Sequence, residues 1–297
     1  MGRFGASLIL ILTLVATASA AEDSAESCRE CHKSQYTEWT GSRHHAAYDN
    51  PIFQRGHRRD PILRCITCHT PTDEQRGAIE EHQDTPLIHE GVTCVSCHLD
   101  GHSSGSKYLK EPELCARCHQ FKFLRGGEFA QRTYSEWQAY RKQGGTKTCQ
   151  DCHMPGGSHS FLGGHSLKKL RKALQIRWSK NSEAAVVWIK NVGAGHDVPT
   201  GDVFRELKVE VKERGKSFYK PVTSIGRNPF FRSVNGDSVL AWKNNNALRP
   251  GEERKILIKV KHPVSVRVIY YYEGRIPELD LLDGDQLAHL VVAEKKY

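Results

Sequence analysis

The chain has 297 residues and a formal net charge of +9, a balance that could attract nucleic acid or an anionic membrane. No nucleic-acid-binding motif accompanies the charge. No stretch after residue 20 approaches the roughly 18 consecutive apolar residues that a membrane-spanning helix needs. We therefore expect no nucleic-acid partner and no stable insertion into a membrane.

The first twenty residues have the pattern of a secretory signal peptide. Arg3 gives a short positive region, residues 7–15 form an apolar run, and Ala18-Ser19-Ala20 is a small-residue cleavage site. A membrane anchor is the alternative, but the apolar run is too short to span a bilayer comfortably, and no Cys at the cleavage point could take a lipid. We expect cleavage after Ala20 and a mature protein in the periplasm or outside the cell.

All ten cysteines lie in five copies of Cys-x-x-Cys-His, the pattern of a c-type haem attachment site. The two thiols form thioethers with the haem vinyl groups, and the adjacent His is the proximal ligand of the iron. A zinc ribbon needs no His after every second Cys, and neither a disulfide framework nor a thioredoxin-like motif would repeat one spacing five times. The expected haem-binding cysteines are Cys28, Cys31, Cys65, Cys68, Cys94, Cys97, Cys115, Cys118, Cys149 and Cys152. The expected proximal ligands are His32, His69, His98, His119 and His153.

Residues 21–171 contain all five motifs and form the predicted pentahaem cytochrome c domain. The gaps between motifs leave room for one modest helix or loop per haem, so the porphyrins must supply much of the core. Helices are expected at residues 34–48 and 130–143. The basic side chains of this segment are better explained as partners of haem propionates and as solvated surface than as a nucleic-acid site.

Residues 172–297 contain no Cys and have the period-two alternation of half-buried strands. Strands are expected around residues 185–189, 207–212, 256–260, 264–272 and 288–293, separated by turn signals such as Arg249-Pro250-Gly251. So many short strands favour an antiparallel β-sandwich, with a barrel as the alternative. The predicted fold class is therefore α + β in two domains: a mainly helical and irregular multihaem domain, followed by the β-sandwich.

The sequence identifies the distal ligand of each iron less directly than the proximal ligand. The chain has 16 His, and its only Met residues are Met1 in the signal and Met154 beside a proximal His, so His on both sides of each iron is the expected ligation. His57 and His82 lie among charged residues and are interpreted as ordinary surface residues. The distal candidates are His44, with His45 as its neighbouring alternative, His89, His102, His159, His165 and His196.

His196 lies in a loop stiffened by glycine and proline, residues 193–201. Glycine frees the backbone for a close approach, and Pro199 fixes the direction in which the chain leaves. One interpretation is a simple turn with an incidental His. The other is that His196 crosses from the predicted β-domain to ligate a haem of the preceding segment.

Several segments together resemble the multihaem cytochrome superfamily that includes pentahaem nitrite reductase, hydroxylamine oxidoreductase and smaller tetrahaem electron carriers. They are residues 28–44, Glu90-Gly91-Val92, residues 133–155, 158–165 and 195–201. The resemblance implies covalent haems in close-packed stacked and perpendicular pairs. It departs from the nitrite reductases, which have a Lys in place of His at the catalytic haem, and from the hydroxylamine oxidoreductases, which have more haems and a cross-linked Tyr.

These observations predict an exported pentahaem cytochrome that transfers electrons through five covalent haem c groups, and favour a non-catalytic protein over an enzyme. Its expected partners are redox proteins, either other cytochromes or a membrane quinol-linked donor. Two alternatives stay open. One is a small oxidoreductase acting on nitrite, nitric oxide or hydroxylamine at a five-coordinate haem. The other is a homo-oligomeric subunit of an extracellular filament or conduit.

Overall fold

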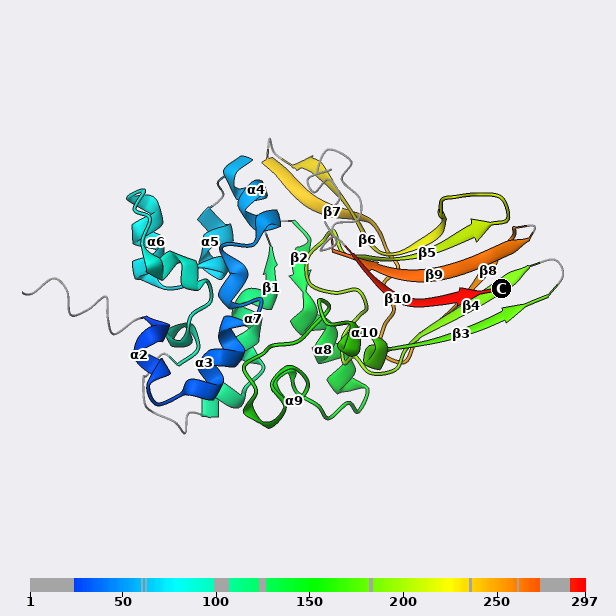
Figure 1. Cartoon of the computed structure of the whole chain (residues 1–297). Coiled ribbons are helices and arrows are strands. Elements are labelled where there is room, and N and C mark those ends of the chain that lie inside the picture. Colours follow the sequence, from blue (N-terminus) through cyan, green and yellow to red (C-terminus); the bar gives the residue numbers. More distant parts are fainter. Residues whose placement is uncertain are drawn as a thin grey trace, which may run out of the picture. The chain divides into compact units, whose positions relative to one another are not determined.

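Helices carry the first part of the chain and strands most of the second (Figure 1). The structure, a computed structural model, describes residues 24–59, 61, 63–98, 107–122, 127–181, 184–234, 237–260, 262–272 and 289–297. The predicted signal peptide and His102 lie outside these residues. The chain forms two compact units, residues 1–104 and 105–297. The predicted domain boundary at residues 171/172 is a different division, and it stays a prediction.

The first unit is built from short helices and 3₁₀ turns. They are α2 (Ala25–Arg29), α3 (Lys33–Thr40), η1 (His45–Ala47), α4 (Pro51–Arg59), α5 (Leu63–His69), α6 (Asp73–Glu80), η2 (Pro86–Glu90) and η3 (Cys94–Ser96). The helix predicted over residues 34–48 is interrupted after α3. The Ser42 hydroxyl accepts hydrogen bonds from the backbone N–H groups of His44 at 3.2 Å and His45 at 3.3 Å. Such side-chain bonds to the backbone compete with continuation of a helix.

The second unit begins with a helical part that surrounds a two-stranded sheet. The predicted helix at 130–143 is observed as α8, and the residues just before it form a strand. The elements are η4 (Lys107–Lys110), α7 (Glu113–His119), β1 (Gln120–Lys122), β2 (Phe129–Arg132), α8 (Thr133–Lys142), α9 (Cys149–His153), η5 (Pro155–Gly157) and α10 (Leu167–Ala173).

The rest of the second unit consists of two antiparallel sheets, with strand orders β10-β9-β5-β6-β7 and β3-β4-β8. The strands are β3 (Leu174–Lys180), β4 (Ala185–Asn191), β5 (Glu206–Glu213), β6 (Lys220–Val234), β7 (Asp237–Asn245), β8 (Glu253–Ile258), β9 (Pro263–Tyr271) and β10 (His289–Lys296). All five predicted strand regions are thus strands. The α + β fold class is confirmed.

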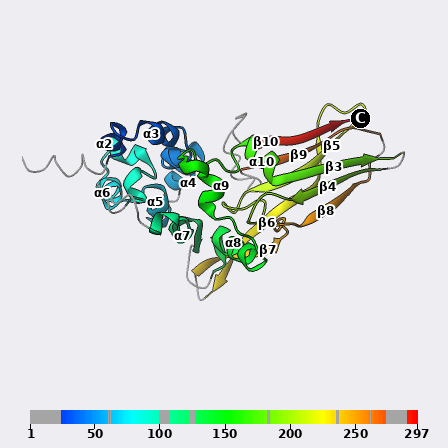
Figure 2. The ribbon, with the colours of Figure 1, turned by 90° about the horizontal axis from the view of Figure 1, so that it is seen from below.

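One hydrophobic core joins the two sheets. It includes Val187 and Ile258 from the three-stranded sheet and Val209 and Val268 from the five-stranded sheet, each fully buried. Along each of these strands, the residues that enter the core occupy alternate positions, as expected for strands with one face in the core. Figure 2 shows strands of both sheets running alongside one another in this unit. Among the described residues, no helix is long and apolar enough to cross a membrane.

Candidate haem-binding sites

Each of the five motifs lies in or beside a helical turn. The third illustrates the geometry: the backbone N–H of His98 donates to the carbonyl of Cys94 at 3.0 Å. Residues three and four positions apart lie on the same side of such a turn, so both thiols and the imidazole point the same way. All ten cysteines are free thiols with accessible surface. This donor set fits a covalently attached haem.

Two proximal imidazoles are fixed by their second ring nitrogen. The Nδ1 atom of His69 is 2.6 Å from the carbonyl oxygen of Ala47, and Nδ1 of His153 is 2.8 Å from that of Leu162. A histidine that donates Nδ1–H to a carbonyl keeps the lone pair of Nε2 for a metal. The anchored tautomer is therefore the one that iron requires.

The carboxylate of Glu90 links the first and third motifs through hydrogen bonds. It accepts hydrogen bonds from the Ser24 hydroxyl at 2.6 Å, the Ala25 N–H at 2.9 Å and the Thr93 hydroxyl at 2.6 Å. The helix that carries Cys28 thus meets the turn that carries Cys94. Burial, reinforced by the neighbouring Cys28 thiol, raises the pKa of Cys94 to about 12.

The fourth and fifth motifs form a second pair. The side-chain amide of Gln150, inside the fifth motif, donates to the carbonyls of Leu109 at 3.2 Å and Glu111 at 3.0 Å, just before the fourth. The thiol of Cys149 lies near that of Cys115, and the interaction between them is the main cause that raises the pKa of Cys149. Each unit thus brings two motifs close together, and the haem packing that the family resemblance implies stays a prediction.

His119 of the fourth motif retains accessible surface, yet protein atoms surround its ring on most sides. This desolvation lowers the pKa of His119 to about 4. The pKa matters more than the accessible surface for ligation, because iron binds the neutral imidazole. His119 is therefore neutral and able to bind a metal at physiological pH.

His44 and His45 lie beside the residues that precede the third motif. The carbonyl of His44 accepts a hydrogen bond from the N–H of Val92 at 2.9 Å. Gly91, at φ +58°, allows this approach, because a Cβ there would lie 2.5 Å from the carbonyl oxygens of both histidines. The His45 ring packs edge-on against Trp39, with ring centres 4.5 Å apart. Either histidine stays a candidate ligand.

His89 is engaged differently from the other candidates. Its Nδ1 and Nε2 atoms lie 2.8 Å and 2.7 Å from carboxylate oxygens of Asp49 and Asp84. These two hydrogen bonds raise the pKa of His89. A protonated histidine has no lone pair for iron, so this arrangement favours an ion-pair role over ligation.

His57 is a candidate that the sequence reasoning missed. It lies on α4, where the Phe53 ring is parallel to both His57, at 5.3 Å between centres, and the proximal His69, at 3.8 Å. Its Nδ1 is buried, without a hydrogen-bond partner among the described residues, and burial lowers the pKa of His57. The signal available in the sequence was the Phe53–His57 spacing, which places both rings on one face of a helix.

The ring of His196 lies near that of the proximal His153 and nearly parallel to it. The two ring centres are 6.3 Å apart and the ring planes differ by 12°. This separation is too long for ring contact. It matches two imidazoles bound on opposite sides of one metal, where nitrogen–metal distances of about 2.0–2.1 Å give about 6 Å between ring centres. The Nδ1 of His196 is 2.8 Å from the carbonyl oxygen of Asp197, so its Nε2 is also left for a metal.

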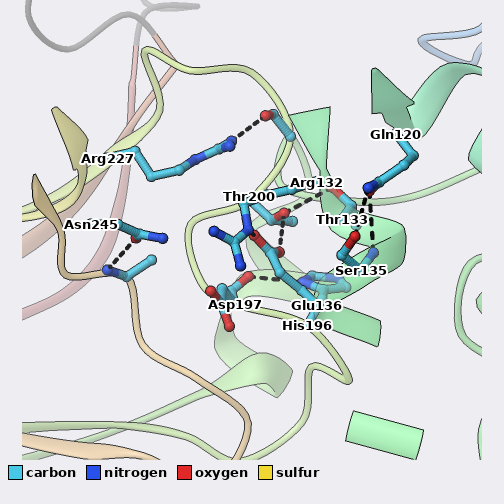
Figure 3. A network of polar contacts seen from close by, with 12 residues as sticks. Gln120, Arg132, Thr133, Ser135, Glu136, His196, Asp197, Thr200, Arg227 and Asn245 are labelled. Carbon is cyan, nitrogen blue, oxygen red and sulfur yellow. Dashed lines mark hydrogen bonds and ion pairs between the residues drawn. The ribbon is translucent and has the colours of Figure 1, made fainter. Parts of the chain in front are cut away.

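Figure 3 shows the polar network that holds the His196 loop. The buried carboxylate of Glu136, on α8, accepts a hydrogen bond from the Thr200 hydroxyl at 2.6 Å, and Thr200 also contacts the Thr133 hydroxyl at 2.8 Å. The Arg132 guanidinium lies 3.4 Å from the same carboxylate. Burial, reinforced by the charge of Glu136, raises the pKa of Asp197 to about 6. The loop is thus joined to α8 by side chains from both.

The last two predicted ligands lie in the segment after the fifth motif. The Nδ1 of His159 is 2.8 Å from the carbonyl oxygen of Gly157. The His165 ring stacks on Tyr272 of the five-stranded sheet, with centres 3.9 Å apart. Their roles as ligands stay predictions.

Comparison with known proteins agrees with this geometry. Residues 27–99, which contain the first three motifs, match the family described as cytochrome c554 and c-prime. The fold is similar to the crystal structure of a penta-heme cytochrome c552 from Thermochromatium tepidum. The two share 20% sequence identity and a TM-score of 0.69, over 92% of this chain and 98% of that chain. No curated protein matches the sequence.

Proposed function

We infer that this multihaem c-type cytochrome is an exported electron carrier, in which five covalent haems are ligated by His on both sides. The family match and the fold support electron transfer. The five Cys-x-x-Cys-His motifs support the number of haems. Bound haem iron supplies reversible one-electron chemistry.

The separation and parallel planes of His153 and His196 carry the proposal. An electron carrier needs both axial positions closed, so that no solute binds to the iron. His153 and His196 are each fixed through Nδ1 by a backbone carbonyl. Desolvation lowers the pKa of both imidazoles, so that both are neutral at physiological pH. Two rigid, neutral imidazoles suit a haem iron that changes its charge during electron transfer but keeps the same ligands.

Partners and location follow from the same proposal. We propose that the protein acts in the periplasm or outside the cell, after removal of residues 1–20, and exchanges electrons with other cytochromes or a membrane quinol-linked donor. No nucleic acid is involved. The shared core of the two sheets supports a β-sandwich, which would place the His196 loop at its edge.

Electron paramagnetic resonance of the oxidised protein tests the proposal. We expect five haems per chain by pyridine haemochrome assay and low-spin signals only. His196→Ala should convert one of the five haems to high spin, whereas His262→Ala, a change at a surface histidine of the same unit, should leave all five low-spin.

Two results would contradict the proposal. A high-spin haem in the wild type would favour a small reductase or oxidase with an open iron. A wholly low-spin His196→Ala variant would remove His196 from the ligand set. Growth of the scattering mass with concentration would instead support a filament subunit.

A further inference from the structure

Arg205 is a half-buried cation on the loop before β5. Its guanidinium lies against Gly201, where a Cβ would be 3.0 Å from Nη1 and 3.2 Å from Cζ. Gly201 has φ +87°, a conformation that favours glycine, so the backbone there leaves room for the guanidinium. Nη1 is 3.5 Å from the carbonyl oxygen of Thr200, a long hydrogen bond, and the Tyr270 hydroxyl is near enough to raise the pKa of Arg205.

Tyr270 connects Arg205 to the fifth motif. Its hydroxyl oxygen would be 3.1 Å from a Cβ on Gly164. The preceding Gly163 lies beside the proximal ligand, since a Cβ there would be 3.9 Å from Cε1 of His153. The charge of Arg205 also helps to lower the pKa of His119 and His196. Arg205 therefore lies within electrostatic range of His119, the motif histidine of the fourth motif, and of His196.

The neighbouring Arg227 shows what a purely structural arginine looks like in this unit. It is 4% exposed, donates to the carbonyls of Ala130, at 3.1 Å, and Gly201, and lies over the Trp242 ring at 5.0 Å. Its donors are satisfied by backbone groups. Arg205 has one long backbone contact and one hydroxyl partner, and no ion pair within the described part of the chain includes it.

Burying a guanidinium, even in part, costs free energy unless an anion or several acceptors compensate it. Its planar fork matches the two oxygens of a carboxylate. The Asp202 carboxylate is exposed, and one of its oxygens accepts the N–H of Phe204 at 3.1 Å. The adjacent Glu206 is paired with Lys208 at 2.9 Å and accepts the Ser224 hydroxyl at 2.6 Å. Neither nearby acid therefore forms an ion pair with the fork.

We propose that Arg205 and the Tyr270 hydroxyl form an anion site that holds a propionate carboxylate of the haem attached at the fourth or fifth motif. The inference rests on haem attachment at these motifs and not on the assignment of His196 as a ligand. A free oxyanion has the same chemistry. The tethered carboxylate is favoured because covalent attachment keeps it at a high effective concentration beside the site.

The consequence is a higher reduction potential for that haem. A cation near the iron stabilises the reduced form, which carries one positive charge less than the oxidised form. Arg205→Gln removes the cation and leaves the propionate charge uncompensated, and both changes favour the oxidised form. Arg205→Lys retains the charge without the fork and should recover most of the potential. Tyr270→Phe removes only the hydroxyl and should shift the potential less, in the same direction.

Spectroelectrochemical titration of the full-length haem protein measures these potentials. In Arg205→Gln we expect the ratio of oxidised to reduced form of one haem to rise about tenfold at a fixed potential, which is a downward shift of about 59 mV for a one-electron couple. The other four haems should keep their potentials. Arg177→Gln is the matched control, because Arg177 is an exposed arginine paired with Glu253, and it should shift none.

Two outcomes would overturn the proposal. One is an Arg205→Gln protein with five low-spin haems and unchanged potentials. The other is a saturable spectral change on adding nitrite or azide to the wild type that disappears in Arg205→Gln, since the site would then be open to soluble anions. Both differ from failure of the electron-carrier proposal, which would appear as a high-spin haem in the untreated wild type.

Discussion

At the scale of single residues, the ligands differ in how far the sequence could predict them. The proximal histidines follow from the covalent chemistry, because a thioether pair and an imidazole must occupy one short turn. The distal ligands are set by folding. His57 and His89 illustrate this: the isolated sequence favoured His89, yet the structure gives His89 two carboxylate partners and places His57 in a stack with Phe53 and His69.

Asp197 gives a prediction at this scale. Its folded-state pKa of about 6 lies above the ordinary value of 3.8, so the folded protein holds this proton more tightly than the unfolded chain. The resulting contribution to stability is complete below about pH 4 and is lost as the pH rises through 6. Asp197→Asn should therefore stabilise the protein by about 3 kcal/mol at pH 7.5 and by almost nothing at pH 4. Urea unfolding followed by circular dichroism at several pH values measures the difference.

The matched control is Asp202→Asn, a change at an exposed carboxylate of the same loop. It should leave the pH dependence of unfolding as in the wild type. If Asp197→Asn also retains the wild-type dependence, the buried carboxyl is not the group that titrates.

At the scale of secondary structure, strands with clean alternation could be predicted and interrupted ones could not. β5 and β9 alternate regularly and were expected from the sequence. β6 contains Pro221, Gly226 and Pro229, which weaken a strand pattern. It is nevertheless a single long strand that pairs first with β5 and then with β7, with a bulge between Asn228 and Pro229. The proline and glycine residues of β6 thus accompany irregular pairing but do not end the strand, because β6 pairs with a neighbouring strand over each part of its length.

The ion pair between β5 and β9 gives a prediction for these elements. The Glu210 carboxylate accepts hydrogen bonds from Arg267 Nε at 3.0 Å and Nη2 at 2.8 Å, and from the Tyr271 hydroxyl at 3.1 Å. Arg267→Gln leaves a nearly buried carboxylate short of its cation and should lower the free energy of unfolding by about 3 kcal/mol. Chemical denaturation measures the loss.

Two further variants isolate the cause. Adding Glu210→Gln to Arg267→Gln removes the uncompensated charge and should restore part of the stability. Arg177→Gln breaks the exposed pair with Glu253 and should cost less than about 1 kcal/mol. Equal losses in Arg177→Gln and Arg267→Gln would show that burial of the pair is unimportant.

At the scale of the whole molecule, composition and compactness divide the chain at different places. The change from cysteine-rich to strand-forming sequence predicts a boundary at residues 171/172, and the division into compact units falls at residues 104/105. Composition records where haem motifs occur. It cannot show that the fourth and fifth motifs pack in the same unit as the strands, because that depends on contacts such as Thr200 with Glu136 across distant parts of the chain.

Cutting the chain at the two boundaries distinguishes these descriptions. A protease site at 104/105 in the haem-loaded protein should leave two folded fragments, with three haems on the first and two on the second. Ending the chain at residue 171 removes His196 and leaves Leu170 without its core partners, so the fourth and fifth haems should bind poorly and one should be high-spin. Haem content by mass spectrometry and spin state measure the result. Five low-spin haems in the shortened chain would contradict it.

The thiol pairs Cys28–Cys94 and Cys115–Cys149 have a consequence for biogenesis. In an oxidising compartment, thiols held near each other are readily converted to a disulfide, and a disulfide has no thiol left to react with a vinyl group. A chain that folded before receiving its porphyrins would bring together cysteines of different motifs. We therefore expect maturation to depend on timing, because the haems must be attached before the chain folds. The constraint is tighter for Cys115 and Cys149, which follow each other more closely during export.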